Sequence, residues 1–386
     1  MTTLPGRTTA AAATAAATAA ATAAATTAAT TAAATAATTA TPATAGGDDG
    51  PGTGPRPVVL LLPGQGAQYE GMAVGLYDAE PVFTAAMDEV FELMGAEGRR
   101  VRADWLSDRP AVPLDDVTRA QALLFAVDHA LARLVLSWGV RPAAVLGHSV
   151  GEVVGAVLTG VLDLPDAVRL QMDRISRISA APPGGMLAVA ARREELAPYL
   201  SEQVVVGVVN GARQCVLAGP EAELAPVEAG LRADGFLCRR TRAVQGFHSP
   251  SLAAAAAQSL PTVADLRLSP PSPTLFSGYT AGPLSPEQAT DPAFWAGQPA
   301  APVLFGPALG RLLDTGRYVL VEAGPGQGLT ALARRRPAVS SGRSAAVPTL
   351  PARRGAPADD RRTVLAAAAF LRAEGHGSVP AEPALT

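Results

Sequence analysis

Ser149 stands at the centre of a Gly-x-Ser-x-Gly pentapeptide, within the stretch AVLGHSVGEVVGAV. A serine hydroxyl is a weak nucleophile near neutral pH and needs a base that accepts its proton. The glycines at 147 and 151 allow the sharp turn of a nucleophile elbow, in which a strand ends at the serine and a helix begins after it. The apolar run before the pentapeptide and the helical spacing after it fit this arrangement. We therefore expect the Ser149 hydroxyl to stand above the end of a buried strand.

Four histidines are candidates for the base. His148 precedes Ser149, but neighbouring side chains diverge in such a turn, so we expect it to pack and hydrogen-bond beneath the elbow. His129 lies in an apolar helical segment and is expected to be a core or boundary residue, and His376 lies in the tail. His248, in AVQGFHSPSL, lies where an inserted domain would rejoin the main one and would face the cleft between them. By elimination and position, we predict that His248 is the base.

Backbone N–H groups close to the elbow are the expected donors to an acyl oxyanion. The N–H of Val150, at the start of the elbow helix, is one candidate. The N–H of Gln65, in the PGQGAQ loop that follows an earlier strand, is the second. Taken alone this loop could be a simple turn. A phosphate cradle is disfavoured because no lysine or further glycine pattern follows.

Arg174 is the next residue with a possible chemical role. The helix from Ser149 and the helix that begins near Asp163 have similar lengths at about 1.5 Å per residue, so an antiparallel pair returns Arg174 to the level of Ser149. A guanidinium in that place suits a substrate with its own carboxylate, held by two parallel hydrogen bonds. Spacing alone leaves open the alternative that Arg174 is a solvated helix residue.

Composition restricts the class of protein further. The 386 residues are 48% hydrophobic and allow one large domain or two ordinary ones, and the net charge of −3 gives no electrostatic case for nucleic acid or a membrane as partner. Cys215 and Cys238 indicate free thiols in a reducing compartment. Two cysteines and four scattered histidines do not suggest a zinc site, so no metal is expected. We expect a cytoplasmic enzyme.

Alternating strand and helix patterns predict an α/β fold with a hydrolase-like parallel-sheet core, formed by residues 58–184 and 248–350. Residues 185–247 are predicted to form an inserted ferredoxin-like subdomain, because strand and helix patterns follow there in βαββαβ order. Residues 1–57, rich in Ala and Thr and poor in large apolar side chains, are predicted to be a disordered tail or linker.

Eight stretches, in this order, resemble the acyltransferase family that includes malonyl-CoA:acyl carrier protein transacylases and the acyltransferase domains of modular polyketide synthases. They are PGQGAQ, AQALLFAVDHALARL, GHSVGE, Arg174 in its helix, VVNGARQCVLAG, GFHSP, DPAFWAGQPAAPVLF and EAGPGQGLT. The resemblance runs from about Val58 to the end of the chain. Residues 351–386 are similar to the segment that follows these domains in synthases, with a helix expected at Val364–Ala373 and a frayed tail over the last dozen residues.

The resemblance implies a ping-pong reaction. In it Ser149 attacks the thioester of malonyl-CoA, His248 accepts the proton, and the phosphopantetheine thiol of an acyl carrier protein then takes the acyl group from the serine ester. It also implies that a backbone carbonyl near Leu304 orients His248. Arg174 matches the arginine that pairs with the malonyl carboxylate.

The resemblance carries information about the acyl pocket as well. Gln121 and Asn210 match pocket residues of the family. The motif QGFH keeps Phe247, whose ring should fill the space that an α-methyl branch needs, and this favours malonyl over methylmalonyl. Gln245 and Gly246 replace the first two residues of the family motif and leave a roomier or unusual pocket open. SGYTAG in place of SNVTG is a departure that the sequence does not explain.

The resemblance implies no bound cofactor and an acyl carrier protein as partner, possibly one of a polyketide synthase served in trans by a monomer. An excised synthase domain is equally compatible with the sequence. One alternative function is a proofreading hydrolase on the same scaffold, against which Arg174 counts. Another is a non-catalytic module that docks carrier proteins, against which the set of Ser149, His248 and Gln65 counts.

Overall fold

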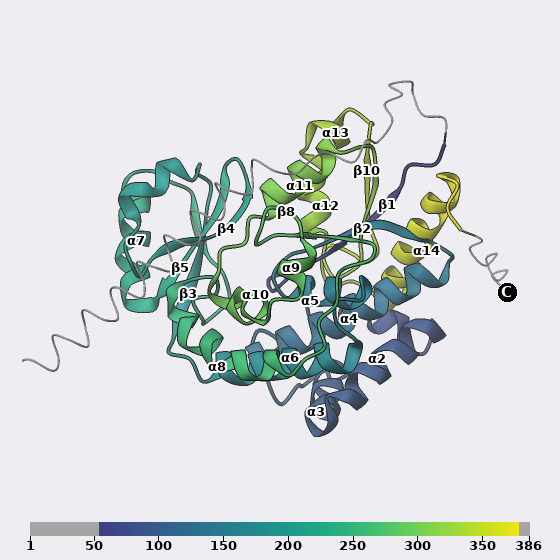
Figure 1. Ribbon diagram of the computed structural model, residues 1–386, viewed down its shortest axis with the longest axis horizontal. Coiled ribbons are helices and arrows are strands. Elements are labelled where there is room, and N and C mark those ends of the chain that lie inside the picture. Colours follow the sequence, from purple (N-terminus) through teal and green to yellow (C-terminus); the bar gives the residue numbers. More distant parts are fainter. Residues whose placement is uncertain (1–53, 378–386) are drawn as a thin grey trace, which may run out of the picture. The chain divides into compact units, whose positions relative to one another are not determined.

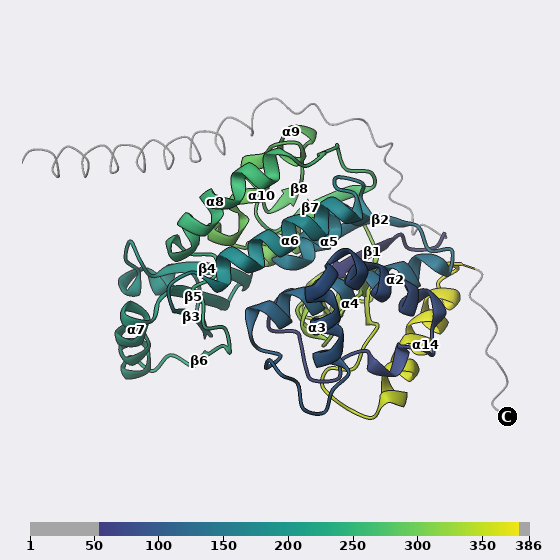
Figure 2. The same cartoon turned by 90° about the horizontal axis from the view of Figure 1, so that it is seen from below.

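The computed structural model describes residues 54–377, and the described chain from Pro55 onward forms one unit. The tail predicted for residues 1–57 lies almost wholly outside the described residues, as does most of the predicted frayed end. Within the described part, two sheets lie side by side with helices packed on both (Figures 1 and 2).

The larger sheet has six strands in the order β10-β9-β1-β2-β7-β8. All neighbours pair in parallel except β7 with β8. The predicted parallel-sheet core is thus confirmed, and β1 and β2 lie where the apolar runs predicted them. The strands are β1 (Val58–Leu62), β2 (Pro142–Gly147), β7 (Thr274–Ser277), β8 (Gly282–Pro283), β9 (Val319–Glu322) and β10 (Ala345–Pro348).

Helices cover both faces of this sheet, as parallel strands require. Side chains of β1 alternate between two apolar clusters, because successive residues of a strand point to opposite faces. Leu60 and Leu62 pack in the cluster with α4 and α5, and Leu61 packs in the cluster with α11 and α12. The longer helices are α2 (Pro81–Leu93), α3 (Gly95–Trp105), α4 (Val117–Ser137), α5 (Val150–Leu158), α6 (Leu164–Ser179), α8 (Ala253–Ala264), α11 (Phe305–Asp314), α12 (Gly328–Arg334) and α14 (Pro357–Ala373).

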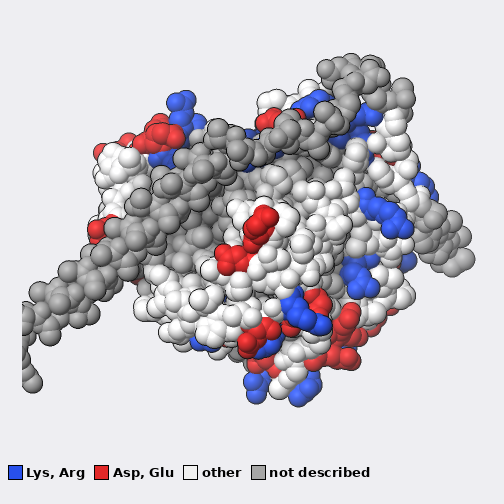
Figure 3. Space-filling model, viewed as in Figure 1, with Lys and Arg blue, Asp and Glu red and all other residues white. Residues whose placement is uncertain are grey.

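Shorter helices connect these elements. They are the α-helices α9 (Pro286–Ala289), α10 (Pro292–Gly297) and α13 (Pro337–Ser340), and the 3-10 helices η1 (Val74–Leu76), η3 (Pro250–Leu252) and η4 (Gln298–Ala300). On the face drawn in Figure 3, the surface over α8 carries few charges, acidic side chains stand out over α9 and α10, and charged side chains gather over α2 and α3. The charged side of the molecule is the one that holds the ion-pair network described below.

α4 is the one helix of the described residues that is long and apolar enough to cross a membrane. Its most apolar window is 83% buried inside the protein. A buried core helix passes the same test of length and hydropathy, and the packing of α4 against α2, α5 and α6 shows it in that position.

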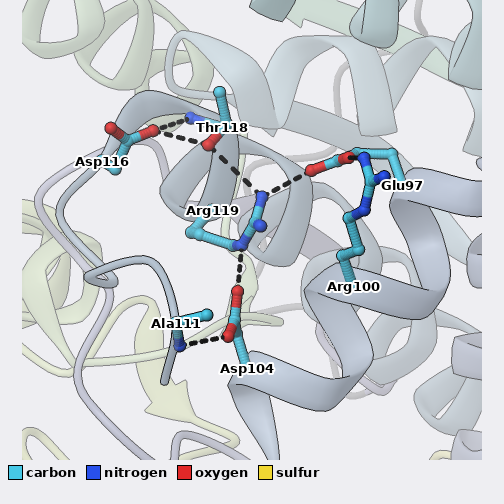
Figure 4. Close-up of polar contacts among 7 residues, drawn as sticks. All are labelled: Glu97, Arg100, Asp104, Ala111, Asp116, Thr118 and Arg119. Atoms are coloured by element: carbon cyan, nitrogen blue, oxygen red, sulfur yellow. Dashed lines mark hydrogen bonds and ion pairs between the residues drawn. The ribbon is translucent and has the colours of Figure 1, made fainter. Parts of the chain in front are cut away.

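An ion-pair network fixes the first turn of α4 (Figure 4). The buried guanidinium of Arg119 donates to Asp104 Oδ2 at 2.6 Å and to Glu97 Oε1 at 2.6 Å, both on α3. Asp104 also accepts the backbone N–H of Ala111 at 2.6 Å. The network therefore holds α3, the loop that follows it and the start of α4 together.

The smaller sheet has four antiparallel strands in the order β4-β5-β3-β6. Its elements are β3 (Gly184–Val189), the 3-10 helix η2 (Glu194–Tyr199), β4 (Val205–Gly211), β5 (Gln214–Pro220), α7 (Glu221–Ala233) and β6 (Cys238–Arg240). The first helix of the predicted order, on the segment REELAPYL, is the 3-10 helix η2. Apart from that helix type, the elements follow in the predicted βαββαβ order, and the subdomain bounds at 185 and 247 stay predictions.

The C-terminal helix α14 begins earlier than the predicted start at Val364. Pro357 and Asp359 in its first turn are residues that favour a helix N-terminus. Asp360 Oδ2 accepts the backbone N–H of Gly75 at 3.1 Å, and a Cβ at Gly75 would collide with the backbone of Pro357. The start of α14 is thus packed tightly against η1.

Candidate active site

Ser149 lies at the sharp turn between β2 and α5, with φ 54° and ψ −117°. A positive φ is uncommon for a residue other than glycine and marks strain that the surrounding structure must hold. The flanking glycines are required by close approach: a Cβ at Gly151 would collide with the carbonyl of Leu62, and one at Gly147 with the backbone of α5. The predicted strand–turn–helix elbow is present.

His248 lies against the elbow although 99 residues separate it from the serine. Its Nε2 is 2.9 Å from Ser149 Oγ, and its Nδ1 is 3.0 Å from the carbonyl oxygen of Ala301 and 3.3 Å from that of Gln298. A carbonyl only accepts, so Nδ1 carries the proton and Nε2 presents its lone pair to the serine hydroxyl. The geometry therefore fixes the tautomer that a base needs.

A carbonyl that orients His248 lies near Leu304, as expected, and belongs to Ala301 in the same APVLF segment. Leu304 is the N-cap of α11, and its carbonyl oxygen already accepts the N–H of Ala308 at 3.0 Å. His248 Nδ1 instead donates to the carbonyls of Gln298, which lies in η4, and of Ala301, which follows it. Neither carbonyl belongs to an α-helix.

Burial changes the acid–base properties of both histidines at the elbow. Desolvation and the neighbouring His148 lower the pKa of His248 to about 4, so its imidazole is neutral at pH 7. The side chain of His148 turns to Asn210, with Nε2 3.0 Å from Oδ1, and its ring packs 5.4 Å from that of Phe305. Desolvation lowers the pKa of His148 as well. His148 thus packs and hydrogen-bonds away from Ser149, as expected.

Arg174 lies in the pocket beside Ser149, so the alternative of a solvated helix residue is wrong. Its side chain is 5% exposed and lines the same pocket as Ser149 and His248. Its Nη2 donates to the carbonyl of Trp295 and, at 2.9 Å, to Gln298 Oε1, while its Nε has no partner. Burial lowers the pKa of Arg174 to about 10, which leaves the guanidinium charged near neutral pH.

Glu152, one turn into α5, is a residue of the site that the sequence analysis did not single out. It is fully buried and accepts from Ser277 Oγ at 2.6 Å, from the N–H of Gly278 at 2.9 Å and from Gln298 Nε2 at 3.3 Å. Gln298 thereby joins Glu152 to Arg174. Burial raises the pKa of Glu152 to about 8. A glutamate in the otherwise apolar segment VGEVVGAVL was the available signal.

Two hollows meet at Ser149. The inner pocket has a volume of about 20 Å³, room for roughly one water molecule, whereas the outer cavity measures about 570 Å³. Of the predicted pocket residues, Gln121 and Phe247 line both hollows, Val150 lines the inner one, and Gln65 and Asn210 line the outer one. The inner pocket is completed by Gln171, Ile178, Tyr279, Gln298 and Pro299.

The PGQGAQ loop lies directly beside the elbow. A Cβ at Gly64 would lie 2.5 Å from the carbonyl oxygen of His148 and 3.2 Å from Ser149 Cβ, so only glycine allows this approach. The neighbouring Gln65 accepts from Gln121 Nε2 at 3.1 Å through its side chain. The loop and the first turn of α5, which carry the two expected oxyanion donors, thus both lie next to the serine.

A serine on a strained elbow, a neutral histidine oriented by a carbonyl and a pocket beside them define the class of serine-dependent acyl-transfer proteins. Residues 59–368 match the acyl transferase domain family, and the chain belongs to this family.

The curated relatives that the chain matches are polyketide synthases. A phenolphthiocerol/phthiocerol polyketide synthase component of Mycobacterium tuberculosis (strain CDC 1551 / Oshkosh) is 38% identical over 281 residues, which are 72% of this chain and 19% of that protein. Polyketide synthase GfsA of Streptomyces halstedii is 37% identical over 292 residues, which are 71% of this chain and 4% of that protein. The chain therefore spans less than a fifth of the length of these relatives.

Solved structures agree. The acyltransferase domain from the second module of the salinomycin polyketide synthase has a TM-score of 0.76 and 34% identity, over 84% of this chain and 75% of that chain. The malonyl CoA-acyl carrier protein transacylase from Burkholderia pseudomallei has a TM-score of 0.65 and 26% identity, over 73% of this chain and 99% of that chain. The chain is an acyltransferase of the polyketide synthase type, related to malonyl-CoA:acyl carrier protein transacylases.

Proposed function

We propose that this acyltransferase moves a malonyl group from malonyl-CoA to the phosphopantetheine thiol of an acyl carrier protein through an acyl-serine intermediate. The observation that carries the proposal is the meeting of three groups in one pocket: the Ser149 hydroxyl, the neutral imidazole of His248 and the charged guanidinium of Arg174. The first two suit acyl transfer in general, and the third selects an acyl group that ends in a carboxylate.

In the first half-reaction, Ser149 Oγ attacks the thioester carbonyl while its proton moves to His248 Nε2. The N–H groups of Val150 and Gln65 hold the oxyanion. When the tetrahedral intermediate collapses, the carbon–sulfur bond breaks and the imidazolium returns the proton to the leaving thiolate. Because Nδ1–H stays on the Ala301 carbonyl throughout, the imidazole keeps its orientation in both states.

In the second half-reaction, the carrier's pantetheine thiol gives its proton to His248 and attacks the carbonyl carbon of the serine ester. The ester bond to Oγ then breaks, and His248 Nε2 returns the proton to Oγ, which restores the serine hydroxyl. The outer cavity, which reaches from Ser149 past Asn210 to Arg239 and Arg242, is the route by which we expect the pantetheine arm to arrive. The partner is thus an acyl carrier protein, and no bound cofactor takes part.

The malonyl carboxylate pairs with Arg174 in the inner pocket. The unpartnered Nε of Arg174 is a buried donor without an acceptor, which a carboxylate oxygen would satisfy. Phe247 closes the pocket against larger acyl groups. Monomeric state and cytoplasmic location stay predictions from the sequence.

The proposal is tested by following the acyl group from labelled malonyl-CoA in the presence of a holo carrier protein. We expect the label on the carrier's pantetheine thiol, and its loss with Ser149→Ala or His248→Ala. Release of free malonic acid without transfer would instead indicate the hydrolase, and the absence of any turnover would indicate a docking module.

A further inference from the structure

Tyr279 lies in the acyl pocket, in the SGYTAG segment that follows β7. Its ring centroid is 6.0 Å from that of His248, and its ring also packs edge-to-face on Phe294 at 6.3 Å. Its backbone N–H donates to Ser277 Oγ at 3.0 Å. Tyr279 is therefore held both through its main chain and through its ring.

Tyr279 lines the inner pocket together with Ser149, Arg174 and His248, which brings its phenol within reach of the reacting groups. It lies close enough to Ser149, Arg174 and Glu152 for each to act on its ionisation. Burial of this end of the side chain raises the pKa of Tyr279, so the phenol stays protonated near neutral pH and is able to donate a hydrogen bond. The structure thus places a second donor beside Arg174.

Covalent geometry determines which atom of the acyl group lies next to Tyr279 once Ser149 is acylated. The Cα of an acyl group is two bonds away from Ser149 Oγ, so it must lie where the inner pocket begins. That pocket has a volume of only about 20 Å³, with Phe247 and Tyr279 both in its wall. A substituent on Cα adds about one methyl group of volume at the point where the phenol ring forms the pocket wall, so it would have to displace that ring.

We propose that Tyr279 is a specificity-determining residue of the acyl pocket: its ring excludes acyl groups branched at Cα, and its hydroxyl, together with Arg174, hydrogen-bonds the acyl carboxylate. This inference rests on the proposed malonyl transfer and adds to Phe247 a second residue that sets the acyl group. The inference thereby gives a chemical role to Tyr279 in SGYTAG, the segment whose difference from the family's SNVTG the sequence did not explain.

To test this, the full chain is incubated with equal concentrations of malonyl-CoA and methylmalonyl-CoA. The ratio of methylmalonyl-enzyme to malonyl-enzyme is then measured by intact-mass spectrometry. Tyr279→Val should raise the methylmalonyl-to-malonyl ratio by about tenfold or more, the range that one methyl group commands in a fitted pocket. Tyr279→Leu, which retains more volume, should raise it less. Tyr279→Phe should leave the ratio within about twofold but raise KM for malonyl-CoA about tenfold, because one hydrogen bond to a charged group is lost.

Tyr318→Val is the matched control, because Tyr318 bonds to Thr315 away from the pocket. It should leave both the ratio and KM unchanged. The inference is judged on the Val or Leu variant that folds and still forms malonyl-enzyme. If the methylmalonyl-to-malonyl ratio of that variant equals the wild-type ratio, the inference is wrong and the proposed function remains intact. A wild-type chain that forms no acyl-enzyme with either thioester would overturn the proposed function, and this inference with it.

Discussion

At the scale of single residues, the His248 imidazole has one free nitrogen and a fixed direction. Nδ1–H is bound to backbone carbonyls and Nε2 points to Ser149 Oγ, so no rearrangement is needed before the proton moves. The strained backbone at both residues, with φ 54° at Ser149 and 62° at His248, keeps the two side chains in this relation.

The depressed pKa of His248 predicts the pH dependence of acylation. Its pKa of about 4 means that the neutral, basic form is already populated above that pH, so the rate of acyl-enzyme formation should be flat from about pH 5 to 7 and fall below about pH 4. Quenched-flow measurement of the Ser149 adduct at several pH values checks this. An inflection close to about 6.5, the value of a solvated imidazole, would contradict the account.

Arg174→Ala should separate acyl groups by charge. Loss of the paired guanidinium should lower kcat/KM for malonyl-CoA about 100-fold and leave that for acetyl-CoA the same or higher, because acetyl has no carboxylate to pair. Arg177→Ala, on the same helix but paired with Asp173 outside the pocket, is the matched control and should change neither. Equal losses for both thioesters in the Arg174 variant would remove its proposed role.

At the scale of elements, the network of Arg119 couples α3 to α4. Burial opposes the charged forms, but hydrogen bonds prevail and lower the pKa of both carboxyls. Asp104 accepts from Arg119, and Glu97 accepts from Arg100 and Arg119. A group with a depressed pKa in the folded state stabilises the fold above its unfolded pKa, and this contribution disappears as the pH falls through the folded value.

Arg119→Met should therefore lower the free energy of unfolding by about 3 kcal/mol at pH 7, since Asp104, only 10% exposed, loses its ion-pair partner. The difference from wild type should shrink below about pH 4, where the carboxyls become protonated. Urea unfolding at pH 7 and at about pH 3 measures both values. A difference that is constant with pH would show that packing of the arginine stem, rather than its charge, is responsible.

Elements with strong local patterns were predictable from the sequence. The apolar runs of β1 and β2, the elbow glycines and the cap at Asp163 are all local signals. Helix lengths put Arg174 level with Ser149 but left a solvated position open, and the family resemblance favoured the pocket. The role of His248 as the base could be predicted by elimination, because the sequence assigned each of the other three histidines to a position away from the Ser149 hydroxyl.

The rest of the site depends on contacts that no local pattern encodes. Glu152 meets Ser277 across 125 positions and Gln298 across 146, so their association follows from strand order and not from spacing. The same holds for Tyr279, whose place after β7 beside β2 required the sheet register. The exact carbonyl near Leu304 that orients His248 could not be predicted, because the sequence does not show where η4 ends and α11 begins.

At the scale of the whole molecule, the two sheets are joined next to the site. The N–H of Val209 on β4 donates to the carbonyl of Val303 at 2.8 Å, and the N–H of Val303 donates to that of Gly207 at 2.8 Å. Asn210, the next residue of β4, binds His148 at the elbow. The smaller sheet thus fixes one wall of the outer cavity relative to the larger one.

Residues near the two ends of the described chain also contact each other. Arg56, just before β1, pairs with Glu374 at the end of α14, and His376 Nε2 lies 2.7 Å from the carbonyl oxygen of Arg56. His376, predicted to lie in the tail, therefore contacts the folded part.

C-terminal truncation tests whether these contacts of Arg56 contribute to stability. Ending the chain after Ala373 should remove about 1 kcal/mol and lower Tm by about 2 °C, because a partly exposed ion pair and one hydrogen bond are lost. Ending it after Gly377 keeps both contacts and provides the reference Tm. Scanning calorimetry of the two truncations and the full chain measures this, and equal Tm values for all three would show that the contacts add nothing to stability.

The most direct measurement of the central claim is intact-mass and peptide analysis of the chain after brief exposure to an equal mixture of malonyl-CoA and acetyl-CoA, with Ser149→Ala in parallel. The account predicts a malonyl ester on the peptide that contains Ser149, in clear excess over acetyl, and no adduct in the variant. An adduct on another residue, an excess of acetyl, or an unmodified wild-type chain would contradict it.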